Sequence, residues 1–245
     1  MDTALSQKSP LISKLESIAR LSDEERQAIL SLPVQEDEIA AHQDIVREGE
    51  HPSSSFYIRS GLTCAYKTTL SGKRQITAIH IAGDAPDLQS LHLDTLDISI
   101  ATLTTSRVVF MRHDDVRELC RRQPRIANIL WRETLIDAAI YREWLTSMGQ
   151  HEGVARIAHF LCEMLLRHKA VGLAQDIDGN PSINWSLTQA QLGDALGLST
   201  VHVNRSLQTL REQGLLFWKG GVLTALNWQG LTAAGEFDPA YLNLR

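Results

Sequence analysis

Apolar residues in the stretch 187–216 recur at the three- and four-residue steps of two short amphipathic helices. The inward positions are Leu192, Ala195 and Leu196 in the first helix and Val203, Leu207 and Leu210 in the second. Gly197 follows the first stripe, at the place where a helix commonly ends in a left-handed residue. The pattern predicts two helices joined by a tight turn.

The residues at the helix ends support this prediction. Thr188 and Gln191 have the Thr-x-x-Gln spacing of a capping box, and Ser199 is a suitable N-cap for the second helix. Gly193 stands on the side where the second helix must come close, so a larger side chain there would hold it away. These features in register favour a helix-turn-helix over an ordinary helical hairpin whose outer face is only solvated.

The outer face of the second helix carries the candidate DNA-contacting side chains. They are Val201, Asn204, Arg205 and Gln208. Side chains on this face can reach base edges in a major groove, so double-stranded DNA is the expected partner. Ser199, Thr200 and His202 begin the same helix and are expected to cap it, contact phosphate or pack, rather than read bases.

A β-hairpin is predicted directly after these helices. Two short β-prone runs, 215–218 and 222–226, are joined by Lys219, Gly220 and Gly221. A helix-turn-helix followed by a hairpin is a winged helix. Lys219, at the expected hairpin tip, is placed to meet a phosphate.

The chain before this region has a different pattern of apolar and polar residues. Residues 11–30 have helical spacing, and Pro33 closes that segment. Short runs with period-two alternation follow between about residues 35 and 112, as in Leu62, Cys64 and Tyr66. Regularly spaced glycines separate these runs, which predicts an antiparallel barrel or jelly roll with a cavity suited to a small ligand.

Helical spacing then returns, and nothing between Pro124 and Met148 breaks it. The apolar stripe of this segment consists of Ile126, Ile129, Leu130, Ile136, Ile140, Trp144 and Met148. Its length favours a parallel seam between two copies over a helix that packs only on its own domain. We therefore expect a sensor domain over residues 1–148, with a dimerisation helix at about 124–148. A winged-helix domain would occupy 149–245, after a hinge at 149–153.

Composition adds three constraints. An apolar content of 43% and a charged content of 22% are typical of a soluble globular protein. The net charge of −5 disfavours sequence-blind nucleic-acid binding but is compatible with a site-specific reader. The sparse cysteines (Cys64, Cys120 and Cys162), the lack of a signal-peptide pattern and the lack of a long apolar run predict a cytoplasmic protein without a membrane partner.

The order of barrel, long helix and winged helix-turn-helix resembles the Crp/Fnr family of bacterial transcription regulators. The resemblance is clearest in LTQAQLGDALGLSTVHVNRSLQTLREQGLL and in GEHPSSSFYIRSGLTCAYKTTLSGKRQITAIHIAGD. It implies an α+β protein with an N-terminal antiparallel β-roll of the cyclic-nucleotide-binding type, a long dimerisation helix and a C-terminal winged helix-turn-helix. It also implies a homodimer that binds a pseudo-palindromic DNA site and regulates transcription beside RNA polymerase.

The resemblance also assigns contacts within the second helix. Arg205 would read guanine through O6 and N7, and Thr200, Val201 and Asn204 occupy neighbouring contact positions. The best-known members often carry a glutamate where Val201 stands. Valine cannot accept a hydrogen bond from cytosine but can contact a thymine methyl, so a different half-site is expected.

The expected sensing site departs further from the family. Members that bind cyclic AMP have a Gly-Glu pair and an Arg-Ser pair where this chain has Pro86-Asp87 and Ile98-Ser99. Without the arginine, Asp87 would repel a cyclic phosphate, so the signal is expected to be something other than cyclic AMP.

No cofactor is predicted. An iron–sulfur cluster of the kind that some members hold needs four cysteine ligands, and the chain has three cysteines. His80, His92 and Cys64 are the candidate haem ligands of the barrel region, and a lone histidine on a strand is more often structural. Asp84, Asp87, Asp94 and Asp97 flank His92 and are expected to cap and solvate a short surface helix rather than to bind metal.

An enzyme is not predicted either, because the chain has neither a phosphate-binding glycine loop nor a Gly-x-Ser-x-Gly elbow. The leading interpretation is a homodimeric regulator whose barrel reports a signal to the DNA-binding domain. Two alternatives stay open: a DNA-binding regulator that needs no effector, and a ligand-sensing or scaffolding dimer that does not bind DNA.

Overall fold

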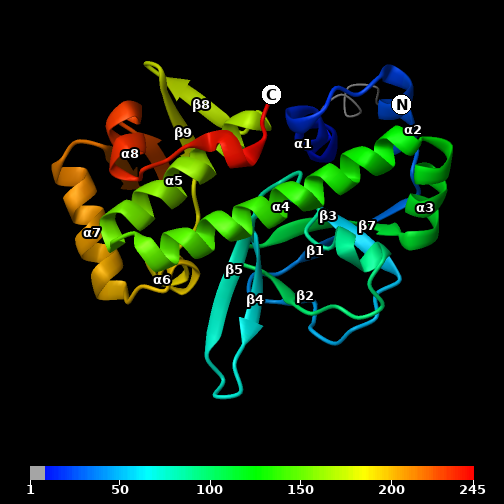
Figure 1. The fold of residues 1–245 in the computed structure, drawn as a ribbon, viewed down its shortest axis with the longest axis horizontal. Helices are drawn as coiled ribbons and strands as arrows, with labels where there is room; N and C mark the ends of the chain where they lie inside the picture. The colour runs from blue at the N-terminus through cyan, green and yellow to red at the C-terminus, as the bar shows by residue number, and fades with distance from the viewer. Residues whose placement is uncertain (1–8) are drawn as a thin grey trace. The chain divides into compact units, whose positions relative to one another are not determined.

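The computed structural model describes residues 9–245, which form two compact units divided after Ala138, within the long helix α4 (Pro124–Gln150) (Figure 1). The helices of the N-terminal unit are α1 (Pro10–Ile18), α2 (Asp23–Leu30), the 3-10 helix η2 (Leu88–Leu91), α3 (His113–Arg122) and the first half of α4. Its strands are β1 (Val34–Ile39), β2 (Asp44–Val46), β3 (Ser54–Ser60), β4 (Thr63–Thr68), β5 (Arg74–His80), β6 (Ser99–Thr102) and β7 (Ser106–Arg112).

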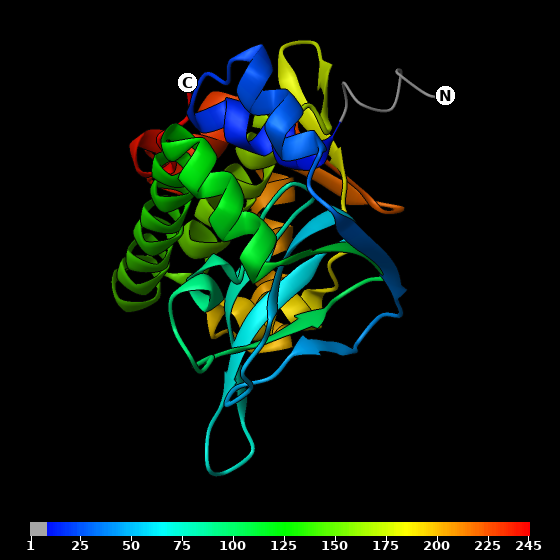
Figure 2. The same ribbon diagram turned by 90° about the vertical axis from the view of Figure 1, so that its right-hand side faces the viewer.

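These strands form two antiparallel sheets, ordered β1-β7-β3 and β2-β6-β4-β5. The interior of the roll is apolar, and the following side chains are at most 1% exposed: Phe56, Ile58, Ile76, Ile79, Ile100 and Val108. The hairpin of β4 and β5 extends past the rest of the roll in both views (Figures 1 and 2). This architecture confirms the predicted antiparallel roll.

The N-terminal segment with helical spacing over residues 11–30 contains two helices. It breaks between Ile18 and Asp23, because Ser22 and Glu25 form a capping box that starts a new helix. Ser22 Oγ accepts from the Glu25 amide at 3.1 Å, and the Ser22 amide donates to the Glu25 carboxylate at 2.7 Å.

Burial along β4 does not follow the predicted alternation. Thr63, Cys64 and Ala65 are all buried, and only the last part of the strand reaches solvent. The strand lies between β5 and β6, and its register with β5 shifts after Ala65. The roll therefore covers both faces of the first half of this strand.

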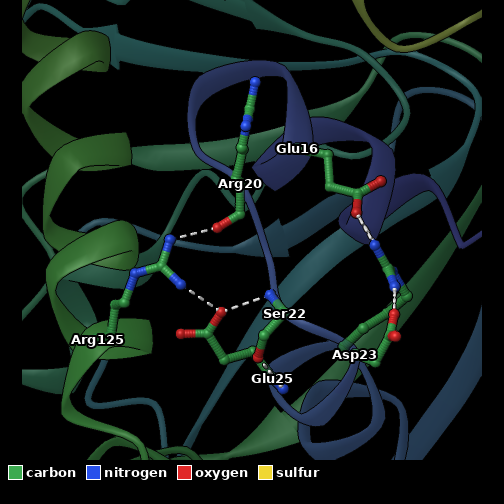
Figure 3. A network of polar contacts seen from close by, with 7 residues as sticks. Glu16, Arg20, Ser22, Asp23, Glu25 and Arg125 are labelled. Carbon is green, nitrogen blue, oxygen red and sulfur yellow. Dashed lines mark hydrogen bonds and ion pairs between the residues drawn. The ribbon is translucent and has the colours of Figure 1, made fainter.

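Two groups of charged side chains attach α1 and α2 to α4. Lys14 Nζ lies 2.9 Å from both Asp84 Oδ1 and Glu133 Oε1, and these three side chains are at most 7% exposed. Arg125 of α4 binds the Glu25 carboxylate at 2.7 Å and a main-chain carbonyl of the α1–α2 connection (Figure 3). The first half of α4 is thereby fixed to the N-terminal helices.

The apolar stripe predicted to form the dimer seam is buried within the chain. These members of it are at most 5% exposed: Ile126, Ile129, Ile136, Ile140 and Trp144. The expectation that this stripe faces a second copy is therefore wrong. The exposed apolar side chains of α4 are Trp131, Leu135 and Leu145, at 66%, 53% and 68%, and helical geometry places them on the opposite face.

The C-terminal unit contains the rest of α4 and a helical layer on a sheet. Its further helices are α5 (Gly153–Ala170), α6 (Gln189–Leu196), α7 (Thr200–Glu212), α8 (Trp228–Ala234) and the 3-10 helix η3 (Pro239–Leu242). Its strands are β8 (Ala174–Ile177), β9 (Asn180–Asn184), β10 (Leu216–Lys219) and β11 (Val222–Ala225), in the sheet order β10-β11-β9-β8. Only His151 and Glu152 separate α4 from α5, so the linker is shorter than the predicted hinge.

A buried polar group organises the core of this unit. The Glu163 carboxylate of α5 accepts from Trp144 Nε1 at 3.0 Å, from the Tyr241 hydroxyl at 2.9 Å and from Arg167 at 3.0 Å. Glu163 is fully buried, so these three donors replace the water it has lost. They connect the last part of α4, α5 and the C-terminal segment.

Candidate nucleic-acid interface

Helix α6 and the turn after it have the predicted geometry. The Thr188 amide donates to Gln191 Oε1 at 2.9 Å, and the Gln191 amide donates to Thr188 Oγ1 at 3.2 Å, which completes the capping box. Gly197 ends the helix with a φ of 64°, in the left-handed region. These local interactions confirm the helix boundaries predicted from the sequence.

Gly193 permits the close approach predicted for it. A Cβ atom built at this position would lie 2.6 Å from the carbonyl oxygen of Leu198 and 3.6 Å from Val203 Cγ2. The Leu198 amide also donates to the Gly193 carbonyl at 3.0 Å. The turn itself, more than the second helix, occupies the space that a side chain would need.

Helix α7 divides into an inner and an outer face as expected. Val203, Leu207 and Leu210 are fully buried, and they fix the rotation of the helix about its axis. The predicted contact residues Thr200, Val201, Asn204, Arg205 and Gln208 are all exposed. Val201 is 68% exposed.

The start of α7 combines a cap with a first turn that has no carboxylate. Ser199 Oγ accepts from the His202 amide at 3.3 Å and lies 3.1 Å from His202 Nδ1. The first turn contains no acidic residue. The positive end of the helix dipole is therefore available to a DNA phosphate.

The wing is a tight hairpin of β10 and β11. Lys219 pairs with Val222, and the two residues between them, Gly220 and Gly221, have φ values of 62° and 77°. Such a turn requires positive φ at both central positions, which glycine adopts without strain. Lys219 is exposed and is the last strand residue beside the tip, not part of the turn that the sequence suggested.

The sequence prediction missed the support behind this hairpin. β11 also pairs with β9, and β8 with β9, so the wing belongs to a four-stranded sheet. The turn of the β8–β9 hairpin is Asp178-Gly179, and Asp-Gly is a typical hairpin dipeptide. The Asp178-Gly179 dipeptide was therefore the sequence signal from which the β8–β9 hairpin could have been predicted.

Arg156 is a residue whose structural role the sequence analysis did not predict. Its guanidinium donates to the carbonyls of Leu196, Met148 and His151 at 2.8–2.9 Å. It thus satisfies carbonyls at the ends of α6 and α4, and burial lowers its pKa. Arg156 positions the helix-turn-helix without facing the exposed side of α7.

The segment of the roll expected to sense a ligand, around Asp87, directs the side chains of Asp87 and Ser90 into the protein and not toward solvent. Asp87 is fully buried, and its Oδ1 accepts from the Phe56 amide at 2.9 Å. Burial raises the pKa of this carboxyl to about 7. Ser90 lies between Asp87 and His113, with its hydroxyl 3.0 Å from His113 Nε2.

Two of the four aspartates therefore do not solvate a surface helix as predicted. Asp84 is 3% exposed, and its Oδ2 accepts from the Ile81 amide at 2.8 Å. Asp87 is equally withdrawn from solvent, because both carboxylates satisfy main-chain amides inside the unit. Asp94 and Asp97 are exposed, as expected.

The candidate cofactor ligands differ in their burial. Cys64 is fully buried 2.8 Å from an Arg74 nitrogen, and burial raises the pKa of its thiol to about 11. His80 is buried and His92 exposed. Across residues 9–245, no three His, Cys, Asp or Glu side chains form a group suited to a metal ion. No helix in that range has the length and hydropathy needed to cross a membrane.

Comparison with known proteins agrees with this architecture. A model of the Crp-like helix-turn-helix domain matches residues 155–234, and a model of the cyclic nucleotide-binding domain matches residues 36–123. Together they cover more than half of the chain.

The relatives found are regulators and not enzymes. The fumarate and nitrate reduction regulatory protein of Vibrio cholerae is 25% identical over 185 residues, which are 76% of this chain and 72% of the relative. The transcriptional activator protein anr of Pseudomonas aeruginosa is 23% identical over 176 residues, 72% of this chain and 70% of that protein. The structure of FixK2 from Bradyrhizobium japonicum shares the fold, with a TM-score of 0.73 at 23% identity over 83% of this chain and 98% of that one. The chain is a member of the Crp/Fnr family of bacterial transcription regulators.

Proposed function

We propose that this protein is a homodimeric regulator that binds a pseudo-palindromic DNA site through α7. One observation carries the proposal: the buried face of α7 fixes a uniformly exposed face that holds Val201, Asn204, Arg205 and Gln208. An arginine on such a face can bind guanine O6 and N7 with two hydrogen bonds. Ser199, Thr200 and His202 begin this helix, and Lys219 is an exposed residue of the wing; we assign phosphate contacts to these four side chains.

The exposed face of α4 supports the proposed dimer. Trp131, Ala138 and Leu145 are separated by seven residues each, with Leu135 and Arg142 beside them. A seven-residue repeat places side chains along one seam of a parallel two-helix coiled coil. The dimer interface is thus assigned to the face opposite the buried stripe.

A dimer assigned in this way can be tested by changing its most exposed apolar side chain. Leu145→Glu places like charges opposite each other at the seam, and we expect it to convert the dimer to a monomer in analytical ultracentrifugation. A matched control is Leu70→Glu, at a fully exposed position in the β4–β5 turn. A protein that is monomeric before any substitution, at micromolar concentration, contradicts the seam.

The proposed signal is not cyclic AMP. Asp87 is directed into the protein to bind the Phe56 amide, and Ile98 stands where the family's phosphate-binding arginine is expected. Neither side chain can neutralise a cyclic phosphate. By analogy with the family, the DNA-bound dimer would act beside RNA polymerase.

The proposed function is tested by selecting binding sites from a pool of randomised duplex DNA. A homodimer should enrich a two-fold symmetric sequence with half-sites about one helical turn apart. Enrichment without any added small molecule indicates a regulator that needs no effector. If only cell extract permits enrichment, an effector is required, and no enrichment under either condition contradicts DNA reading.

Arg205→Ala then tests the assigned reader on the selected site. We expect specific binding to fall by about 1–3 kcal/mol and discrimination at one base pair to be lost. Arg211→Ala is the matched control, because Arg211 is an exposed arginine in the last turn of the same helix. Equal effects of the two substitutions would show that Arg205 acts only through its charge.

A further inference from the structure

The N-terminal unit contains an open cavity that lies outside the DNA-binding machinery. Its volume is about 660 Å³, and η2, α3 and the first half of α4 supply its walls. Small-molecule sites commonly have volumes of roughly 300–1,000 Å³ and a predominantly apolar lining. The dimension suits a compact ligand.

The walls of the cavity are largely hydrocarbon. Leu88 and Leu91 come from η2, Val116 from α3, and Leu130 and Trp131 from α4. Trp131 lines the cavity and is 66% exposed. Removing an apolar molecule from water into this space is favourable in proportion to the apolar area that it buries.

The charge of the lining is unlike that of the chain as a whole. The lining includes Arg117 and Arg121 but no aspartate or glutamate, whereas the chain has a net charge of −5. Arg117 Nη2 donates to the Leu91 carbonyl at 2.9 Å, which fixes this guanidinium next to the cavity. Arg121 is 73% exposed.

Both arginines also have carboxylate neighbours on α3. Arg117 lies 3.5 Å from Asp114, and Arg121 lies 2.8 Å from Glu118. Exposed pairs of this kind contribute about 0–1 kcal/mol, so a ligand carboxylate can replace or share them. The positive side of the cavity is therefore accessible to an anionic group.

We propose that this cavity binds a small amphipathic acid, with its apolar body between η2, α3 and α4 and its carboxylate at Arg117 and Arg121. The occupant is a small molecule, and its recognition does not depend on DNA binding. Arg121 makes the acid preferred over a neutral molecule with the same apolar body. Leu88, Val116 and Leu130 provide affinity that does not depend on charge.

Cys120 provides a direct measurement, since it lines the cavity and is half-buried. Cys64 and Cys162 are fully buried, so alkylation of the folded protein by iodoacetamide reports on Cys120. The probe is decanoate, and decanol is its uncharged counterpart. We expect decanoate to slow alkylation at concentrations about ten-fold lower than decanol requires, as measured by mass spectrometry.

Arg121→Gln should remove this ten-fold preference and leave protection by decanol unchanged. Arg122→Gln is the matched control, since Arg122 is 75% exposed and also pairs with Glu118 but does not line the cavity. Ala127→Phe, which fills the cavity, should abolish protection by both probes, with circular dichroism confirming that the variant is folded.

Three results would overturn the proposal. Protection by neither probe excludes the site, and equal protection by decanoate and decanol excludes recognition of an acid. Trp131 lines the cavity and also belongs to the proposed dimer seam, so protection of Cys120 that appears with rising protein concentration without either probe, and that Leu145→Glu abolishes, would show that the second copy and not a small molecule covers the cavity. DNA selection with the same variants reports separately on the proposed function, so the two failures are distinguishable.

Discussion

The outer face of α7 and the segment around η2 both carry polar side chains near positions that the family uses for binding, but they direct them oppositely. Asn204, Arg205 and Gln208 are exposed, while Asp87 and Ser90 are buried and bind groups of the protein itself. A polar side chain that is buried and hydrogen-bonded to groups of its own unit is withdrawn from contact with a ligand in solvent. The outer face of α7 thus offers exposed side chains to an external partner, whereas Asp87 and Ser90 serve the internal structure of the roll.

The charged side chains buried in the N-terminal unit show this internal role most clearly. Lys14 lies between Asp84 and Glu133 in a nearly dry environment, and Asp87 is buried close by in sequence. Buried charged groups are expensive unless they are paired and hydrogen-bonded. This region should therefore respond to substitution in stability, whereas the outer face of α7 should respond in DNA affinity.

The largest expected effect is that of Lys14→Met. Removing the ammonium group leaves two carboxylates near each other without their shared cation, and breaking a buried pair in this way costs about 3–5 kcal/mol. Urea denaturation of the variant measures the loss. Lys67→Met is the control, because the ion pair of Lys67 with Glu48 is exposed. Similar losses in the two variants would show that burial of the Lys14 group contributes little.

Asp87→Asn tests the same region through pH. Burial raises the pKa of Asp87 from the ordinary value of 3.8 to about 7, so the folded state holds a proton that the unfolded state has lost. This carboxyl therefore lowers stability progressively as the pH rises from about 4 to above 7, by about 4 kcal/mol at full ionisation.

The asparagine side chain can accept from the Phe56 amide and does not ionise. The variant should thus gain stability relative to the unsubstituted protein between pH 5 and pH 8. Asp94→Asn, at an exposed position of the same segment, should not change this dependence. Parallel pH profiles for the protein and Asp87→Asn would contradict the buried, ionisable state.

The contrast between α7 and the segment around η2 also explains which features could be predicted from the sequence. The boundaries of α6 and α7 follow from contacts between residues three or four positions apart, such as Thr188 with Gln191. The exposed face of α7 follows from helical periodicity alone. Local chemistry was therefore sufficient for the candidate DNA interface.

The remaining features depend on partners distant in the chain. Lys14 forms an ion pair with Glu133, and Arg156 donates a hydrogen bond to the Leu196 carbonyl. No local sequence pattern predicts either contact. Helix α4 has apolar residues on both faces, so periodicity predicted a stripe but could not say that Ile136 and Ile140 pack inside the chain. The stripe that the sequence assigned to a dimer seam is therefore part of the protein's own core.

The smallest expected loss of stability is that of Gly193→Ala in α6, within the helix-turn-helix that the sequence predicted best. Gly193→Ala places a Cβ atom 2.6 Å from the Leu198 carbonyl, which is main chain and cannot move aside as a side chain does. Overpacking of this kind costs about 1–3 kcal/mol, and the displaced turn should weaken DNA binding as well. Gly149→Ala is the matched control, because this helical glycine has open space around its Cβ direction, and alanine favours helix by up to about 1 kcal/mol. Thermal unfolding of the two variants should therefore shift in opposite directions. If Gly193→Ala is as stable as Gly149→Ala, the turn after α6 adapts to a side chain, and close approach is not the reason for glycine at position 193.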